Sequence, residues 1–486
     1  MKNNVIYAGL ALLLAAPAMA QTSFDAAYLY GQELIGTARY VAMGGAMGAL
    51  GSDASVISQN PAGIGTYHQS DVNVGFSMRG TQSLTNPLLT AYNPGIQGSY
   101  EYYSKNRKSG LAGEFDMLSV ILCSSIGEKS YANLGFVCRR LNGTDRLLDY
   151  IDSFDDDDGY RVSREFLDHR TVNNFAYDFN ISCNFEDILY LGGTLEVQST
   201  DVLSTGYFFD YYDKGAHPEF DEGLDVNIYD NMWSRDDGRG LNLSLGVIVR
   251  PVPVLRLGAA IKTPTRYFQC YDYEYEMVAS NCQKPDAGED GYVCNGYDYR
   301  YTSPWSTSLS AGLTVGTTAI GMELERHYTG RSFVSTDDGF IVDNQGACQY
   351  RDFTTFRLGI ETNIDKFSIR TGFCHNGSMF APGVKTNLGA HNNDVLFDYF
   401  NPENYPDVKY PRADFQLERP GASDYLSFGL GYCSAPDFLG AQFYADMAYV
   451  HGISRSTVGL DEYGSDPEVD YKYKSNRLMF TLGWCF

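Results

Sequence analysis

The sequence predicts an all-β protein: a transmembrane antiparallel β-barrel of about 14 strands. Three observations support this fold class. Apolar and polar residues alternate from residue 71 onward, long and short connections between these segments alternate strictly, and the chain ends on an aromatic residue, Phe486. The composition agrees, because 38 Tyr, 28 Phe and 50 Gly in 486 residues is typical of β-rich chains.

The first twenty residues have the pattern of a secretory signal. Lys2 precedes an apolar run from Val5 to Leu14, and the small-x-small sequence at 18–20 is typical of a cleavage site. We therefore expect residues 1–20 to be a cleavable signal peptide. No later run reaches the roughly 18 consecutive apolar residues that a membrane-spanning helix needs.

The period-two alternation is cleanest in three segments. In "LNLSLGVIVR" (241–250), every second residue is Leu or Val and the residues between them are mostly polar or small. The segments 176–185 and 424–433 repeat this pattern. An apolar face of this kind points inward in a soluble sandwich and outward to lipid in a membrane barrel, so periodicity alone leaves both folds open.

The lengths of the connections favour the membrane barrel. Between the predicted strands, long connections such as 141–171, 200–237 and 267–302 alternate with tight ones such as "RPVP" and "NIDK". All long connections then lie at one end, as in outer-membrane barrels, and an even strand number leaves no unpaired edge in lipid. The 14 predicted strands are 71–80, 110–126, 130–140, 172–185, 188–199, 238–250, 253–266, 303–316, 319–328, 351–363, 366–376, 423–434, 440–452 and 474–486.

The last predicted strand has an aromatic and aliphatic face. "NRLMFTLGWCF" places Leu478, Phe480, Leu482, Trp484 and Phe486 on one side. A terminal strand of this kind resembles the signal by which the barrel-assembly machinery recognises outer-membrane proteins. We therefore expect that machinery as a partner through Phe486, outer-membrane lipid as a second partner, and a location in the cell outer membrane of Gram-negative type.

Residues 21–70 do not share the alternation and contain a distinctive motif. Arg39, "MGGA" (43–46), Asp53 and Asn60-Pro61-Ala62-Gly63 follow one another just ahead of the first predicted strand. This stretch resembles the N-terminal signature of the FadL family of outer-membrane transporters for hydrophobic compounds, which includes toluene and xylene uptake porins. Similar stretches occur at 245–265, 357–373 and 427–450.

The resemblance implies a domain division and a function. Residues 21–70 would form a hatch or plug inside the outer-membrane β-barrel of residues 71–486, with Asn60, Pro61, Ala62 and Gly63 ending the hatch; the alternative is an ordinary loop turn. The implied function is passive diffusion of hydrophobic small molecules, such as long-chain fatty acids or aromatic hydrocarbons. Extracellular loops would capture the ligand and a hatch movement would admit it. A surface binding or adhesion barrel, or a haem-binding barrel, is the alternative without transport.

Two groups of residues are candidates for ligand contact. Tyr271, Tyr273 and Tyr275 lie in a connection rich in aromatic residues and form either a capture surface or an aromatic girdle at the membrane edge. Five cations are expected to face the lumen, where they hold a ligand carboxylate or neutralise acidic neighbours such as Glu196, Glu323, Glu361 and Asp446. These cations are Arg250, Arg256, Lys262, Arg357 and Arg370.

Composition and motifs exclude several other classes. A formal charge of −24 disfavours nucleic acid as a partner. HExxH, GxSxG and zinc-type CxxC spacings are missing from the sequence, so we expect no enzyme activity, no metal and no cofactor. Most cysteines lie in predicted strands, where a thiol packs as a small apolar group. Cys282 and Cys294 share one connection, and either a disulfide or two free thiols fits that spacing.

Overall fold

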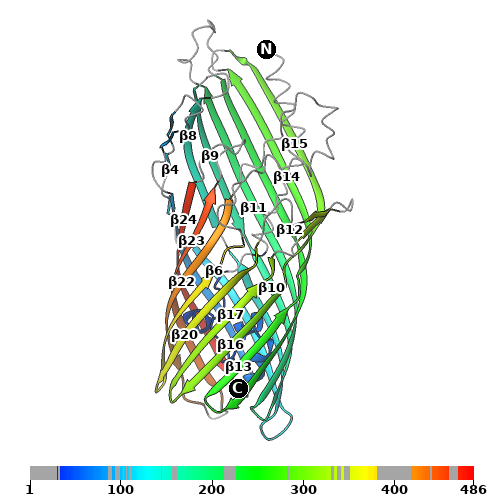
Figure 1. The fold of residues 1–486 in the computed structure, drawn as a ribbon, viewed down its shortest axis with the longest axis vertical. Coiled ribbons are helices and arrows are strands. Elements are labelled where there is room, and N and C mark those ends of the chain that lie inside the picture. Colours follow the sequence, from blue (N-terminus) through cyan, green and yellow to red (C-terminus); the bar gives the residue numbers. More distant parts are fainter. Residues whose placement is uncertain are drawn as a thin grey trace.

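The computed structural model describes residues 30, 33–85, 90–92, 99–101, 103–104, 107–108, 112–143, 145–155, 161–212, 226–281, 284–329, 333–336, 341–343, 351–379, 418–437, 440–458 and 469–486. Figure 1 shows a closed barrel of tilted antiparallel strands. The first and last wall strands pair from Asp71 opposite Cys485 to Thr85 opposite Tyr471, which closes the sheet. The prediction of a 14-stranded antiparallel barrel is thus confirmed.

Each predicted strand overlaps one strand of the wall. The 14 wall strands are β1 (Asp71–Thr85), β6 (Ala112–Ser125), β7 (Tyr131–Asn142), β10 (Asn174–Phe185), β11 (Leu189–Tyr212), β12 (Val226–Val252), β13 (Leu255–Lys262), β16 (Ser306–Val315), β17 (Thr318–His327), β20 (Phe353–Ile364), β21 (Phe367–Asn376), β22 (Glu418–Cys433), β23 (Gln442–Val458) and β24 (Val469–Cys485).

The apolar stripe of each strand faces outward. On β10 the side chains of Phe179 and Ile181 are 51% and 66% exposed, whereas Asn180 and Ser182, which alternate with them, are buried. The same division holds on β12, β22 and β24. An apolar outer face around a polar interior is the arrangement of a membrane barrel and the reverse of a soluble sandwich, which decides between the two folds that periodicity left open.

One side of the wall rises far above the other (Figure 1). There, β11 and β12 remain paired up to Tyr211 opposite Asn227. Two hairpins continue the sheet beside them: β8 (Asp145–Asp155) with β9 (Arg161–Val172), and β14 (Arg266–Asn281) with β15 (Lys284–Thr302). Short strands complete the described part of this end: β2 (Thr90–Tyr92), β3 (Ser99–Glu101), β4 (Tyr103–Ser104), β5 (Arg107–Lys108), β18 (Phe333–Thr336) and β19 (Ile341–Asp343).

These hairpins correct one expectation from the sequence. The connections 141–171 and 267–302 are mostly strands rather than loops, and the segment with Tyr271, Tyr273 and Tyr275 lies within β14. The physical reason is visible in "YDYEYE" (271–276), where a residue with high strand propensity alternates with a charged one. Such a segment pairs readily with a neighbouring strand above the membrane, and the wall continues there.

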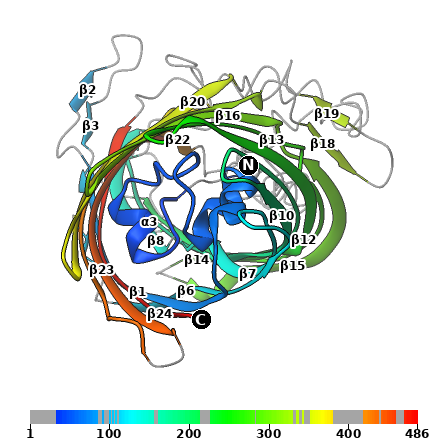
Figure 2. The same ribbon diagram turned by 90° about the horizontal axis from the view of Figure 1, so that it is seen from below.

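Residues 33–70, here called the luminal segment, lie inside the barrel (Figure 2). The segment contains α3 (Ala38–Ala42) and two 3-10 helices, η1 (Ala54–Ser58) and η2 (Pro61–Thr66). Each of the three helices has an N-cap residue whose side chain accepts a hydrogen bond from a backbone N–H of the first turn. These N-cap residues are Thr37, Asp53 and Asn60. These caps satisfy donors that would otherwise be buried without partners inside the wall.

Three findings concern the described residues as a whole. None of their helices is long and apolar enough to cross a membrane. They contain no cluster of His, Cys, Asp and Glu that would hold a metal ion. Seven of their cysteines are free thiols: Cys123, Cys138, Cys183, Cys270, Cys374, Cys433 and Cys485. Cys282 and the side chain of Cys294 lie outside the described residues, so their pairing stays open.

Candidate functional site

Four glycines form a row across adjacent strands of the inner wall. Gly312 of β16 lies opposite Gly321 of β17, which lies opposite Gly359 of β20, which lies opposite Gly372 of β21. We call these four residues the glycine row. Without side chains, the row forms a path along which another backbone can approach the sheet closely.

The luminal segment runs along this row. A Cβ atom at Gly321 would lie 1.8 Å from the carbonyl oxygen of Ala46, and one at Gly359 would lie 2.2 Å from that of Met43. Polar contacts fix the two ends of this stretch. The hydroxyl of Ser427 donates to the Ala42 carbonyl at 3.1 Å, and Arg256 Nη1 donates to the Leu50 carbonyl at 2.5 Å. Residues 42–50 are therefore held against the wall at backbone distance.

The Asn-Pro-Ala-Gly motif occupies a second close contact. Gly192 of β11 and Gly246 of β12 lie opposite each other, and Cβ atoms there would lie 2.4 Å from the Pro61 carbonyl oxygen and 2.0 Å from Asn60 Oδ1. The Asn60 amide also caps η2 through Ala62 N–H and donates to the Val247 carbonyl at 3.2 Å. The motif thus seats the last part of the luminal segment on the wall, seven residues before Ser70 leads into β1.

A group of charges joins α3 to the neighbouring wall strands β20, β21 and β23. Arg39 donates through Nε and Nη2 to the two carboxylate oxygens of Glu361, each at 2.9 Å. Arg370 Nε also donates to Glu361 at 2.6 Å, and its Nη1 donates to Asp446 at 2.5 Å. Since Glu361, Arg370 and Asp446 are all buried, these charges stabilise the fold only as a complete set.

A second charged group holds the start of the luminal segment. Glu33 contacts Arg477 of β24 at 2.9 Å and Arg79 of β1 at 3.5 Å. Burial by itself raises the pKa of Glu33, but the two guanidinium groups outweigh burial and hold this pKa at about 2. The Glu33 carboxylate is therefore charged at neutral pH, and it ties the segment to the strands that close the barrel.

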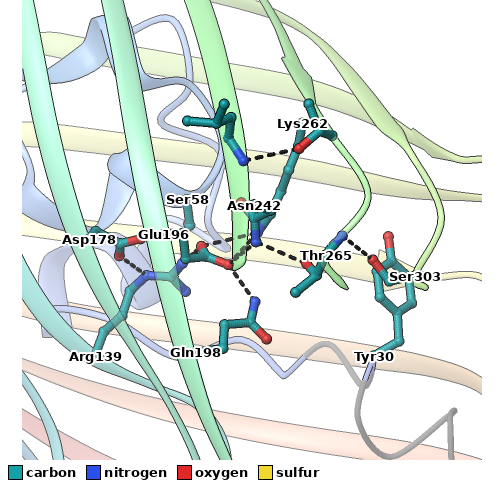
Figure 3. Close-up of polar contacts among 12 residues, drawn as sticks. Tyr30, Ser58, Arg139, Asp178, Glu196, Gln198, Asn242, Lys262, Thr265 and Ser303 are labelled. Atoms are coloured by element: carbon teal, nitrogen blue, oxygen red, sulfur yellow. Dashed lines mark hydrogen bonds and ion pairs between the residues drawn. The ribbon is translucent and has the colours of Figure 1, made fainter. Parts of the chain in front are cut away.

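A third polar group surrounds Glu196 on the inner wall, beside Ser58 of the luminal segment (Figure 3). Its carboxylate accepts bonds from Arg139 Nη2 at 2.5 Å, Asn242 Nδ2 at 2.7 Å, Lys262 Nζ at 2.9 Å and the Gln198 amide. Arg139 Nε in turn donates to Asp178 at 2.6 Å. Five wall strands, from β7 to β13, contribute to this cluster, so it braces the barrel from inside.

The five predicted lumen cations divide into two sets. Lys262 pairs with Glu196, and Arg357 Nη1 pairs with Glu323 at 2.6 Å and with Glu325 at 2.9 Å. Arg370 pairs with Glu361 and Asp446, as described above. Arg250 and Arg256 form no ion pair with a carboxylate among the described residues: Arg250 donates to the Pro253 carbonyl in an exposed turn, and Arg256 lies over the Tyr190 ring.

Several important residues escaped the sequence reasoning. Arg139, Asp178 and Glu325 are charged residues in the middle of otherwise alternating strands, and this position alone indicates a polar lumen. Arg39 was noticed only as part of a motif, although it is the cation that joins the luminal segment to Glu361. The side chains of Tyr271, Tyr273 and Tyr275 lie outside the described residues, so their role stays a prediction.

The fold is similar to that of two solved structures. A FadL homologue from Pseudomonas aeruginosa matches with a TM-score of 0.58 and 13% sequence identity, over 94% of this chain and 99% of that chain. The toluene transporter TodX of P. putida matches with a TM-score of 0.51 and 12% identity, over 93% of this chain and 99% of that one. No family model and no curated protein matches the sequence. At these identities the likeness establishes a shared fold.

Proposed function

We propose that this barrel is a passive outer-membrane channel for hydrophobic small molecules, with the luminal segment as its hatch. The observation that supports this most strongly is the closely docked luminal segment inside a closed barrel with an apolar outer face. The shared fold with a FadL homologue and a toluene transporter agrees with the proposal. Long-chain fatty acids and aromatic hydrocarbons are the ligand classes to be tested.

The physical reason for a hatch lies in the cost of moving apolar surface into water. An apolar solute that enters a wide, water-filled pore exposes its surface at a cost of about 25 cal/mol per Å². A barrel filled by its own segment leaves no such continuous water path. A hydrophobic ligand can then pass only where the segment shifts away from the wall and offers apolar contacts in place of water.

The contacts of the luminal segment divide into a fixed end and a releasable part. At the fixed end, Ser70 and Phe486 exchange two backbone hydrogen bonds at 3.0 and 2.9 Å. The releasable part is held by ion pairs at Arg39 and Glu33 and by van der Waals contact along the glycine row. In our proposal, the hatch moves about its junction with β1 when these contacts separate.

Arg256 is the cation best placed to meet a ligand carboxylate. It is partly buried, it faces the luminal segment through its bond to Leu50, and no described carboxylate neutralises it. Replacing Arg256 with Gln should therefore weaken uptake of oleate more than uptake of toluene, which has no charged group. Equal effects on both ligands would show that Arg256 only holds the hatch.

Tyr271, Tyr273 and Tyr275 remain our candidates for the capture surface above the membrane. Their alternation in the sequence is that of residues that share one face of a strand. Replacing the three tyrosines with serine should reduce the uptake rate at low ligand concentration if they capture ligand. Unchanged uptake by a correctly folded variant would assign them to an aromatic girdle instead.

The main experiment locks the hatch to the wall. A Cβ at Gly65 of η2 would lie 3.6 Å from the Cβ of Tyr190 on β11, which is within the range that a disulfide spans. The G65C/Y190C variant is expressed in cells that lack the protein, and uptake of labelled oleate and toluene is measured with and without reductant. We expect the wild type to exceed an empty vector, and the oxidised variant to fall to the empty-vector level until it is reduced.

Three controls separate the parts of the proposal. The wild type is measured with and without reductant, and G65C and Y190C are measured singly, because Cys183 lies near Gly65. A wild type that gives no more uptake than the empty vector contradicts transport and favours a binding or adhesion barrel. An oxidised variant that transports as well as its reduced form contradicts hatch gating but leaves transport intact.

A further inference from the structure

The outer face of β24 changes character abruptly toward its upper end. Trp484, Leu482 and Phe480 are exposed apolar side chains, and the next outward positions beyond Leu478 are Asn476, Lys474 and Lys472. On the neighbouring β23 the exposed Met447 and Tyr449 are followed by His451 and Arg455 on the same face. Three cations thus gather just above the apolar belt on adjacent strands.

The register brings these cations close together. Arg455 lies directly opposite Lys472, and Lys474 lies opposite Ile453, one outward position away. Directly opposed side chains have Cβ atoms about 5 Å apart, and like charges at such positions repel. We call Arg455, Lys472 and Lys474 the rim cations. Acidic residues outnumber basic ones by 60 to 36 in this chain, and its formal charge is −24. The overall charge therefore does not explain a cluster of three cations.

Other polar groups on this part of the outer face are mutually satisfied, whereas the two lysines are not. His375 Nδ1 lies 2.7 Å from Asp424, which also accepts from Arg455 at 3.2 Å. Asn476 Oδ1 accepts from Tyr449 at 2.7 Å and lies 2.9 Å from His451 Nδ1. Within the described part of the chain, no carboxylate pairs with Lys472 or Lys474. Among the described side chains of this part of the outer face, one carboxylate, Asp424, therefore lies near the three cations, and it pairs with Arg455.

The height of the rim cations on the barrel identifies the level of the membrane they face. A tilted transmembrane strand crosses the hydrocarbon in about 9 to 11 residues, and the stretch from Phe486 up to Asn476 has that length. Lys474 and Lys472 come next, toward the end of the barrel opposite the C-terminus, where β23 and β24 end well below the tips of β14 and β15 (Figure 1). In an outer membrane this is the headgroup level of the outer leaflet.

We propose that the rim cations bind the phosphate of a phosphorylated glycolipid of the outer leaflet. Cationic side chains form charge-assisted hydrogen bonds with phosphate oxygens, and each contributes to binding at an anionic membrane surface. The acyl chains of the same lipid lie along the apolar belt directly below, at Tyr449 and Phe480. This contact to both parts of one molecule distinguishes a lipid from free phosphate. The inference requires the barrel to be in the membrane and does not depend on transport.

The test uses diphosphoryl lipid A and native mass spectrometry of the detergent-solubilised protein. The test variant is K472Q/K474Q, and the matched control is K129Q/K366Q, which removes two exposed lysines from turns at the opposite rim. We expect the wild type and the control to bind one lipid A equally, and the test variant to bind at least tenfold more weakly. Removing the phosphates from the lipid should have the same effect as removing the lysines from the protein. We therefore expect lipid A without phosphates to bind the wild type at least tenfold more weakly than diphosphoryl lipid A does.

Further variants keep the result interpretable. K472R/K474R retains the charges and should bind as the wild type does, and R455Q added to the test variant should weaken binding further. Heat-modifiable migration on gels verifies that each variant is folded. Undiminished binding by folded K472Q/K474Q, or equal binding of lipid A without phosphates, overturns the proposal. A loss of binding that is equal in K129Q/K366Q also overturns it, because charge alone would then explain the effect.

Discussion

Replacing Gly321 with Ala tests whether the glycine row seats the luminal segment. The new Cβ would lie 1.8 Å from the Ala46 carbonyl oxygen, and Cβ contacts under 3.0 Å essentially never occur. The segment must therefore retreat by roughly 1.2 Å or the strand must bend. Overpacking of a tight contact costs about 1 to 3 kcal/mol, and a clash with backbone oxygen lies at the upper end of that range.

Hydrogen exchange of the Gly48 amide reports this change directly. Its N–H donates to Glu323 of the wall at 3.2 Å, so it exchanges only when the segment leaves the wall. A loss of about 3 kcal/mol corresponds to an exchange rate about 100-fold higher. The control is G113A, because a Cβ at Gly113 on β6 has nothing within 4 Å. Wild-type protection of Gly48 in folded G321A would refute the close docking of the segment on this row.

Three further outcomes follow from the charges and the outer face. E361Q removes the shared partner of Arg39 and Arg370 and should destabilise the folded barrel by about 3 to 5 kcal/mol in denaturant titrations. R39Q should destabilise it less, because Glu361 still pairs with Arg370. An equal loss of unfolding free energy in the two variants would contradict the shared pairing. The pKa of Glu33 is lowered from 4.5 to about 2, so its stabilising effect is complete above pH 4.5 and disappears as the pH falls toward 2. Pepsin should then cut the luminal segment of the wild type increasingly as the pH falls over that range. The cutting of E33Q should not show this additional increase, because residue 33 then has no carboxylate to protonate. I181R places a charge at an outward position that is 66% exposed and should lower the free energy of unfolding in liposomes by about 2 to 4 kcal/mol; an unfolding free energy equal to that of the wild type would argue against lipid contact there.

The sequence was sufficient for the wall because each strand carries its own signal. Alternation such as that of 241–250 depends only on neighbours along the chain, so all 14 wall strands were predicted. The hairpins β8–β9 and β14–β15 were missed because long connections were assumed to be loops, although the alternation at 271–276 indicated a strand. Strand β14 could have been predicted by applying the same period-two rule to this long connection.

The interior was less predictable because it depends on register between strands. The four residues of the glycine row lie far apart along the chain, and only the pairing of β16, β17, β20 and β21 brings them into one row: Gly312, Gly321, Gly359 and Gly372. Ion pairing is similar, since Arg39 and Glu361 are 322 residues apart. A single sequence gives the residue types of such contacts but not which partner each one meets.

The contact of the outer face with lipid is the claim on which the proposed function and the proposed lipid site both rest, and Trp484 tests it directly. This side chain is 51% exposed on the outer face of β24. A W233F/W305F variant, in which Trp484 is the only tryptophan, is reconstituted into liposomes, and its fluorescence is measured with acyl-brominated lipid and with aqueous iodide. We expect strong quenching by the brominated lipid and little by iodide. Quenching by iodide without quenching by the brominated lipid would contradict the membrane barrel.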